Sequence, residues 1–146
     1  MEFTNETCIK LTDLTSENFY DVMPDEFFGH NGGIYILRSF EVNNELPKAI
    51  NRFGGQDENG ILYIGKADLF THRVGDLARC IDKNYSQRKH EAGVRYLTIP
   101  NISLRHPIDN LFVTIVPSKT PHELEKEYLA KYEALFSELP PLNRQG

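Results

Sequence analysis

The pattern of hydrophobic and polar positions predicts three strands. Two runs, "IYILRSF" at 34–40 and "ILYIG" at 61–65, are rich in β-branched and aromatic residues and lie next to glycine. A third run, "LFVTIVP", covers 111–117. We expect an α/β (α+β) fold with a small, mainly antiparallel three-stranded sheet flanked by helices. The polar segment 41–60 predicts a loop with a short helix near "LPKAI".

An amphipathic helix is predicted from about residue 68 to residue 83. Its apolar stripe is formed by Phe70, Val74, Leu77, Ala78 and Ile81. At about 100° per residue, Arg73 lies on the flank of this stripe, and it is the basic residue placed to reach inward over the sheet. The other basic residues of the helix point roughly the opposite way: His72, Arg79 and Lys83.

The last helix is predicted to begin with a capping box at Thr120 and Glu123, with Pro121 at its first position. Its apolar stripe comprises Leu124, Tyr128, Tyr132, Leu135, Phe136 and Leu139. Glu125 falls inside this apolar sector, whereas Glu127 points away from it. A carboxylate on a buried stripe needs a metal, an arginine or a hydrogen-bond donor as its partner. Shorter helices are predicted near 16–23 and 90–99.

The composition is typical of one globular domain. The chain has 146 residues, of which 40% are hydrophobic, and no apolar run is long enough to span a membrane. Its acidic, polar start does not resemble a signal peptide. Cys8 and Cys80 are far apart, which predicts free thiols in a reducing, cytoplasmic setting. We divide the chain into an N-terminal extension, 1–30, and a domain, 31–146. The extension is open to three interpretations: shielding a site, pairing subunits or covering the core.

Charge is distributed unevenly along the chain. The formal net charge is −5, yet the segment 71–106 carries seven Lys and Arg residues against three acidic residues. A local basic surface, rather than the total charge, is what contacts phosphate groups. Charge alone leaves a solvated helix and loop equally open as an interpretation.

A set of short motifs follows the predicted elements in order. Gly33-Ile34-Tyr35 and Tyr63-Ile64-Gly65 lie on the first two strands, and Lys66 follows directly. Arg73 comes eight residues after Gly65, "LEKEYLAKY" covers 124–132, and "PPLN" covers 140–143. With these residues, the segment 31–143 resembles the GIY-YIG nuclease family.

The resemblance implies a metal-dependent endonuclease that hydrolyses phosphodiester bonds in DNA, with one divalent metal, Mg²⁺ or else Mn²⁺. Glu125 would be the metal ligand, and Tyr35 would be the general base or would orient the attacking water. Tyr63 would help to place the water or the phosphate. Lys66 and Arg73 would contact phosphate and lower the pKa of a neighbouring tyrosine. The expected substrate-binding residues are Gly33, Gly65, Arg79, His90 and Asn143, the last bracing the site.

Three departures from the family pattern leave alternatives open. The two motif tyrosines are 28 positions apart, and Leu77 stands where many members have a histidine or tyrosine. Tyr85 and His90 are the nearest substitutes for that residue. The long spacing from Glu125 to Asn143 keeps Glu127 as a competing metal ligand.

Two other functional classes therefore stay open. The first is a nucleic-acid-binding module of the same fold with weak or no catalysis, and the second is a regulatory interaction protein. No separate DNA-reading domain is evident. Sequence specificity would then depend on the 41–60 insert, the 84–106 loop, a homodimer or a protein partner.

Overall fold

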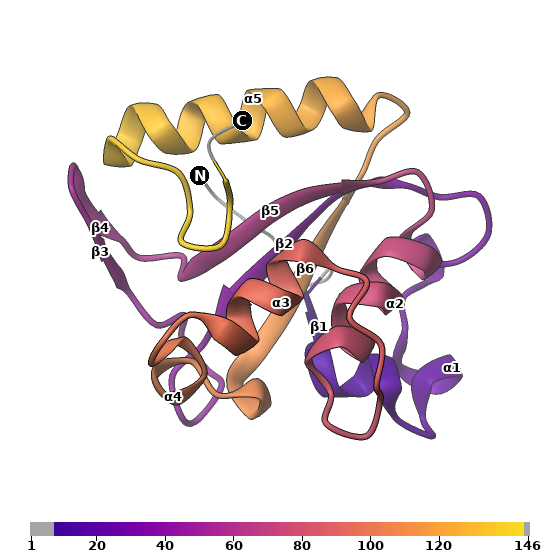
Figure 1. Ribbon diagram of the computed structural model, residues 1–146. Helices are drawn as coiled ribbons and strands as arrows, with labels where there is room; N and C mark the ends of the chain where they lie inside the picture. Colours follow the sequence, from indigo (N-terminus) through magenta and orange to yellow (C-terminus); the bar gives the residue numbers. More distant parts are fainter. Residues whose placement is uncertain (1–7, 145–146) are drawn as a thin grey trace.

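A computed structural model describes residues 8–144, and its centre is a four-stranded antiparallel sheet (Figure 1). The strand order is β1-β6-β2-β5. The three predicted strands are confirmed as β2 (Gly33–Ser39), β5 (Ile61–Ala67) and β6 (Leu111–Pro117). The prediction of a three-stranded sheet was wrong by one strand, because β1 (Cys8–Lys10) pairs with β6 at the far edge. Three residues are too few to give a recognisable alternation.

The order of the strands gives β2 and β5 different environments. β2 lies between β5 and β6, and each of its seven residues is buried. In the antiparallel register, Tyr35 is opposite Gly65 of β5 and Ile115 of β6. β5 has a neighbouring strand on one side only, so the backbone groups on its other side need different partners.

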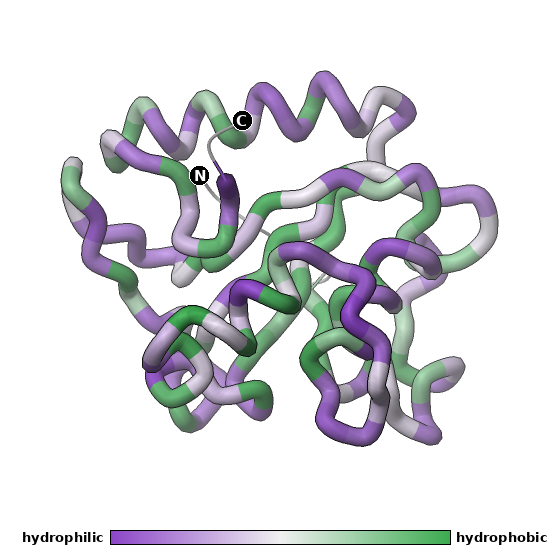
Figure 2. The backbone as a smooth tube through the Cα atoms, in the orientation of Figure 1, coloured by the Kyte–Doolittle hydropathy of each residue, from purple (hydrophilic) through white to green (hydrophobic). Residues whose placement is uncertain are grey.

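Each face of the sheet has its own hydrophobic core, because successive side chains of β2 point to opposite faces. Tyr35 and Leu37 join the larger core, under α2 (Phe70–Ile81) and α3 (Glu91–Thr98). Ile34 and Ile36 join a smaller core, under α5 (Pro121–Phe136). Figure 1 shows α5 on one side of the sheet and α2 with α3 on the other. In Figure 2 the central strands are mostly hydrophobic, whereas α5 alternates between polar and apolar residues.

The described part of the N-terminal segment covers the larger core. It forms η2 (Leu11–Thr15), the one-turn helix α1 (Phe19–Val22) and η3 (Asp25–Phe27). Its buried side chains are Ile9, Leu11, Leu14, Met23 and Phe27. Of the three interpretations of this segment, residues 8–30 therefore match the one in which it covers the core.

The 41–60 insert has no helix near residues 46–50, contrary to the prediction. Pro47 instead forms an isolated bridge with Phe40, and the following residues form a hairpin of β3 (Ile50–Arg52) and β4 (Gly55–Asp57). The hairpin packs on the end of α5, where Arg52 is 2.8 Å from the Glu138 carboxylate. The stability of this segment comes from tertiary contacts, which the local sequence pattern does not encode.

α5 also differs from its prediction in two details. Thr120 precedes the helix, but its side chain makes no capping hydrogen bond, so the predicted capping box is not formed. Leu135 is 52% exposed rather than buried, and Tyr132 is the one fully buried side chain of the helix. The remaining short helices are α4 (Ile102–Arg105) and η4 (Ile108–Asn110). No helix within residues 8–144 has the length and hydrophobicity needed to cross a membrane.

Candidate active site

The two motif tyrosines meet above a glycine. Because Tyr35 is opposite Gly65 in the β2–β5 register, and Tyr63 lies two residues before Gly65, both rings project from the same face. Their ring centroids are 5.9 Å apart. A Cβ atom on Gly65 would lie 2.5 Å from the Tyr63 ring and 2.8 Å from the Tyr35 ring. Gly65 is therefore required for the two rings to share this space.

Gly33 has a different packing role. A Cβ atom there would lie 2.1 Å from the Val116 carbonyl oxygen, and the residue has φ of +155°. Close packing of β2 against β6 accounts for this glycine. Neither Gly33 nor Gly65 needs the approach of a substrate strand to explain it.

Tyr35 is hydrogen-bonded to His90, and both side chains are fully buried. The distance from Tyr35 Oη to His90 Nε2 is 2.6 Å. His90 Nδ1 accepts the backbone N–H groups of Ala92 and Gly93 at the start of α3. Burial, together with the charge of Arg73, lowers the pKa of His90 to about 3. The neutral ring therefore carries its proton on Nε2 and donates it to Tyr35.

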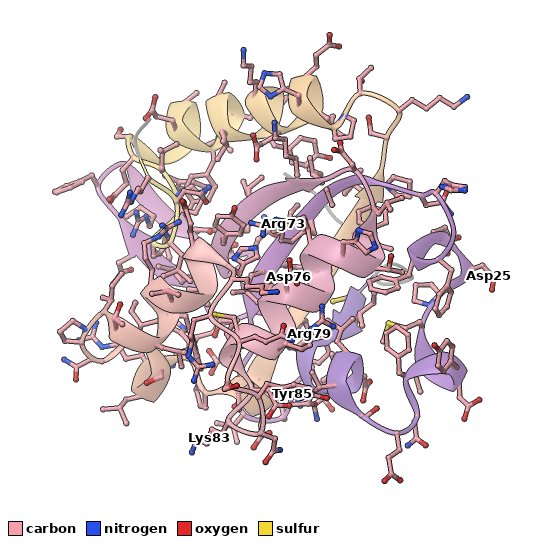
Figure 3. All side chains as sticks on the ribbon, turned by 45° about the vertical axis from the view of Figure 1, so that its right-hand side comes forward. Asp25, Arg73, Asp76, Arg79, Lys83 and Tyr85 are labelled. Carbon is pink, nitrogen blue, oxygen red and sulfur yellow. The ribbon has the colours of Figure 1, made fainter. Side chains whose placement is uncertain are left out.

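Close packing of two helices places His90 beside the tyrosines. A Cβ atom on Gly93 of α3 would lie 2.7 Å from Cys80 Sγ of α2, so the glycine lets the two helices approach. Leu77, at the position where the family carries a histidine or tyrosine, is fully buried in the core. Of the two suggested substitutes, His90 contacts Tyr35, whereas Tyr85 lies with Lys83 away from Arg73 (Figure 3).

Burial raises the pKa of both tyrosines, and their neighbours modify it differently. Burial and the nearby Tyr63 raise the pKa of Tyr35 well above its usual value, although Arg73 lowers it in part. Burial also raises the pKa of Tyr63. A hydrogen bond donated by Tyr35 lowers it, the charge of Glu125 raises it, and the charges of Arg73 and Arg95 lower it. A chain of donors thus runs from α3 through His90 and Tyr35 to Tyr63. Tyr63 is half-buried, so its end of the chain is the accessible one.

Arg73 reaches towards the tyrosines from α2, as the helical pattern predicts. Its guanidinium donates to the Lys89 carbonyl oxygen at 3.4 Å and lies 3.7 Å from the Asp76 carboxylate. Arg79 lies farther along α2, where it pairs with Asp76 at 3.2 Å and donates to Gln87 (Figure 3). Arg79 is therefore separated from the tyrosine pair.

The free edge of β5 is covered by side chains and backbone from the C-terminal part of the chain. Asn143 bonds both the N–H and the carbonyl oxygen of Ile64, at 2.9 Å each. Leu142 N–H donates to the Leu62 carbonyl oxygen. The backbone N–H of Lys66 donates to the Glu125 carboxylate. Asn143 thus braces the strand that carries Tyr63, and Glu125 is held at the end of the same strand.

Glu125 and Glu127 have different surroundings. Glu125 is half-buried, and burial raises its pKa, against the lowering effect of Lys66 and His122. Lys66 Nζ lies 3.0 Å from His122 Nδ1, on this side of β5. Glu127 is exposed and pairs with Lys131 at 3.1 Å. Of the two competing metal ligands, Glu125 is the one beside β5. The side chain of Lys66 lies near Glu125 and His122 rather than near the two tyrosines.

The donor set at Glu125 decides which metal it suits. Within residues 8–144 no group of three or more His, Cys, Asp or Glu side chains could hold a metal ion. A structural zinc site, which needs four protein ligands, does not fit. Magnesium fits, because it binds through one or two carboxylates, substrate phosphate oxygens and several waters.

Comparisons of the chain with protein-family models, with curated proteins and with solved structures find no match. Any inference about function therefore rests on the geometry of the site.

Proposed function

We propose that this chain is a metal-dependent endonuclease of the GIY-YIG type that hydrolyses phosphodiester bonds in DNA. The observation that carries the proposal is the convergence of the motif residues on β5. Tyr35 and Tyr63 meet over Gly65, while Glu125 and Asn143 bind the edge of the same strand. These residues are up to 108 positions apart, so their meeting is a property of the fold rather than of the local sequence.

Tyr63 is the tyrosine that we assign to the attacking water. It is half-buried, whereas Tyr35 is completely buried and cannot touch a water molecule in the site. The hydrogen bond from Tyr35 lowers the pKa of Tyr63 and so favours its phenolate, against the larger raising effect of burial. As a phenolate, Tyr63 would accept a proton from the water as the water attacks phosphorus. Tyr35 would then act through Tyr63, as a positioning residue.

The charged residues would bind the phosphate and the metal. Arg73 can bind two phosphate oxygens with its planar guanidinium, exchanging Asp76 for the substrate. Glu125 would hold the magnesium ion, which when bound supplies positive charge for the transition state and the leaving oxygen. Lys66 would add a further cation beside Glu125.

Nicking of supercoiled plasmid at low salt, with Mg²⁺ or Mn²⁺ against EDTA, tests the proposal. We expect metal-dependent nicking by the wild type and its loss in Tyr63→Phe and Glu125→Ala. Circular dichroism should confirm that both variants fold. A folded wild type that leaves the plasmid intact with both metals would contradict the proposal.

A nucleic-acid-binding module without catalysis is the second candidate. The raised pKa of both tyrosines and the pairing of Arg73 with Asp76 favour it, because each works against a ready base and a free phosphate ligand. DNA binding in EDTA together with no nicking in either metal would select this candidate.

A further inference from the structure

A basic pocket lies directly beside the candidate active site. It has a volume of about 260 Å³ and is lined by Arg88, Lys89, Glu91, Val94, Arg95 and Arg144. Four of the six lining residues are cationic. The one carboxylate, Glu91, lies 3.6 Å from Arg95 and offsets a single charge. The pocket therefore has a positive excess that favours an anion.

Two lining residues of the pocket, Lys89 and Arg144, are adjacent in sequence to residues of the candidate active site. Lys89 precedes His90, and its carbonyl oxygen accepts from Arg73. Arg144 follows Asn143, which braces β5. Consecutive Cα atoms are about 3.8 Å apart, so both lining residues lie one residue from the site. Arg95 joins the walls by donating to the Leu142 carbonyl oxygen at 2.6 Å.

The cationic side chains of the pocket keep N–H groups that are available to a ligand. Among residues 8–144, the exposed side chains of Lys89 and Arg144 make no hydrogen bond or ion pair. Arg88 and Arg95 donate to backbone carbonyl oxygens but keep further N–H groups. These groups can accept an anion without breaking the fold.

We propose that this pocket binds a backbone phosphate of the DNA strand next to the bond that is cut. The inference rests on the proposed function and adds a second anchoring point to it. The pocket is small, and Val94 is its one apolar lining residue, so it has no wall on which a base could stack. A phosphate contact of this kind positions the strand without reading its sequence.

Fluorescence anisotropy of a labelled DNA duplex in EDTA tests the inference, because binding is then measured without cleavage. The test variant is Lys89→Gln/Arg144→Gln, which removes two charges and no internal contact. The matched control is Lys10→Gln/Lys83→Gln, at β1 and at the end of α2 that Figure 3 places away from Arg73. We expect the test variant to raise the Kd about tenfold at roughly 0.1 M salt and to reduce the salt dependence by about one phosphate contact. The control should change the Kd less than about twofold.

The kcat for cleavage at saturating DNA separates this inference from the proposed function. We expect it to be unchanged in the test variant, because the pocket holds the strand and not the reacting phosphate. Equal binding by wild type and test variant, equal weakening by test and control variants, or no binding by wild type would each overturn the inference. If wild type binds but does not cut, while the test variant still weakens binding, the proposed nuclease fails and the pocket stands only as a phosphate contact for bound DNA.

Discussion

The two sides of β5 have different physical characters. On the side of α2 and α3, His90 and Tyr35 are fully buried, neutral and joined by a hydrogen bond. On the side of α5, Lys66 and His122 are exposed and Glu125 is half-buried, and both Lys66 and His122 lower the pKa of Glu125. Under the proposed function, the buried pair sets the position of Tyr63, whereas Glu125 on the α5 side would hold the metal. Substitutions at the buried His90–Tyr35 pair should therefore mainly reduce stability, whereas substitutions at the half-buried Tyr63 and Glu125 should mainly reduce activity.

The largest effect on stability is expected from Gly65→Ala. The new methyl group would overlap both tyrosine rings, at 2.5 and 2.8 Å, and forcing them apart should cost about 3 kcal/mol. Gly75→Ala is the matched control, because its methyl group meets only the flexible end of Arg79 and alanine favours the helix. Urea unfolding measures both. Equal stability of the two variants would show that the rings do not depend on Gly65.

The next prediction compares the two tyrosines. Tyr35→Phe leaves the buried Nε2–H of His90 without an acceptor and should lower the free energy of unfolding by about 2 kcal/mol. Tyr63→Phe removes the acceptor of the Tyr35 hydroxyl, but at the half-buried end of the chain, where water can replace it, so it should lower the free energy of unfolding by only about 1 kcal/mol. Under the proposed mechanism, Tyr63→Phe nevertheless loses more nicking activity. The opposite order of stabilities would contradict the difference that we draw between the two residues.

Lowering the pH should reduce the stability of the protein through its two buried histidines, His90 and His106. Burial lowers the pKa of His90 to about 3 and that of His106 to about 4, so the unfolded chain binds more protons below about pH 6.5. Stability is complete above that pH and falls towards the folded pKa values. On lowering the pH from about 7.5 to about 5.5, each of these two histidines should reduce the free energy of unfolding by about 1.4 kcal/mol. His90→Asn, which keeps a side chain that can cap α3, should remove one such contribution, as urea unfolding at both pH values would measure. An unchanged pH difference in this variant would contradict the buried, neutral state of His90.

The smallest of these effects is expected at the edge of β5. Asn143→Ala removes two hydrogen bonds to Ile64, but water can replace them at this half-buried position, so about 1 kcal/mol should be lost. Amide hydrogen exchange at Ile64 should accelerate more than exchange at Ile36 in the centre of β2. Equal acceleration at both amides would show that Asn143 acts on the whole sheet rather than on its edge.

The parts of the molecule that could be predicted are those with a long periodic pattern. The stripe Phe70 to Ile81 gave α2 its position, and the same geometry put Glu125 rather than Glu127 on the face towards the sheet. β1 and the β3–β4 hairpin were missed, because each strand has three residues and depends on a distant partner.

The contact between His90 and Tyr35 could not be derived from the sequence. The two residues are 55 positions apart, and the packing of α3 on α2 through Gly93 and Cys80 decides their distance. The burial of Tyr35 has a similar origin, since it depends on β2 being central in the sheet. An "HEAG" segment after a polar loop does indicate a helix start, which is the one local signal of the capping role of His90.

The central claim is that the chemistry takes place at the β5 edge, with Glu125 as the metal ligand. The most direct test is the single-turnover rate of plasmid nicking over a Mg²⁺ titration, with Glu125→Gln compared to Glu127→Gln. Each variant replaces one glutamate of α5 by its neutral isostere: Glu125 beside β5, and Glu127 in its exposed pair with Lys131. We expect Glu125→Gln to slow nicking by about a hundredfold to a thousandfold and Glu127→Gln to stay within about twofold of wild type. Equal rates in the two variants would contradict the claim.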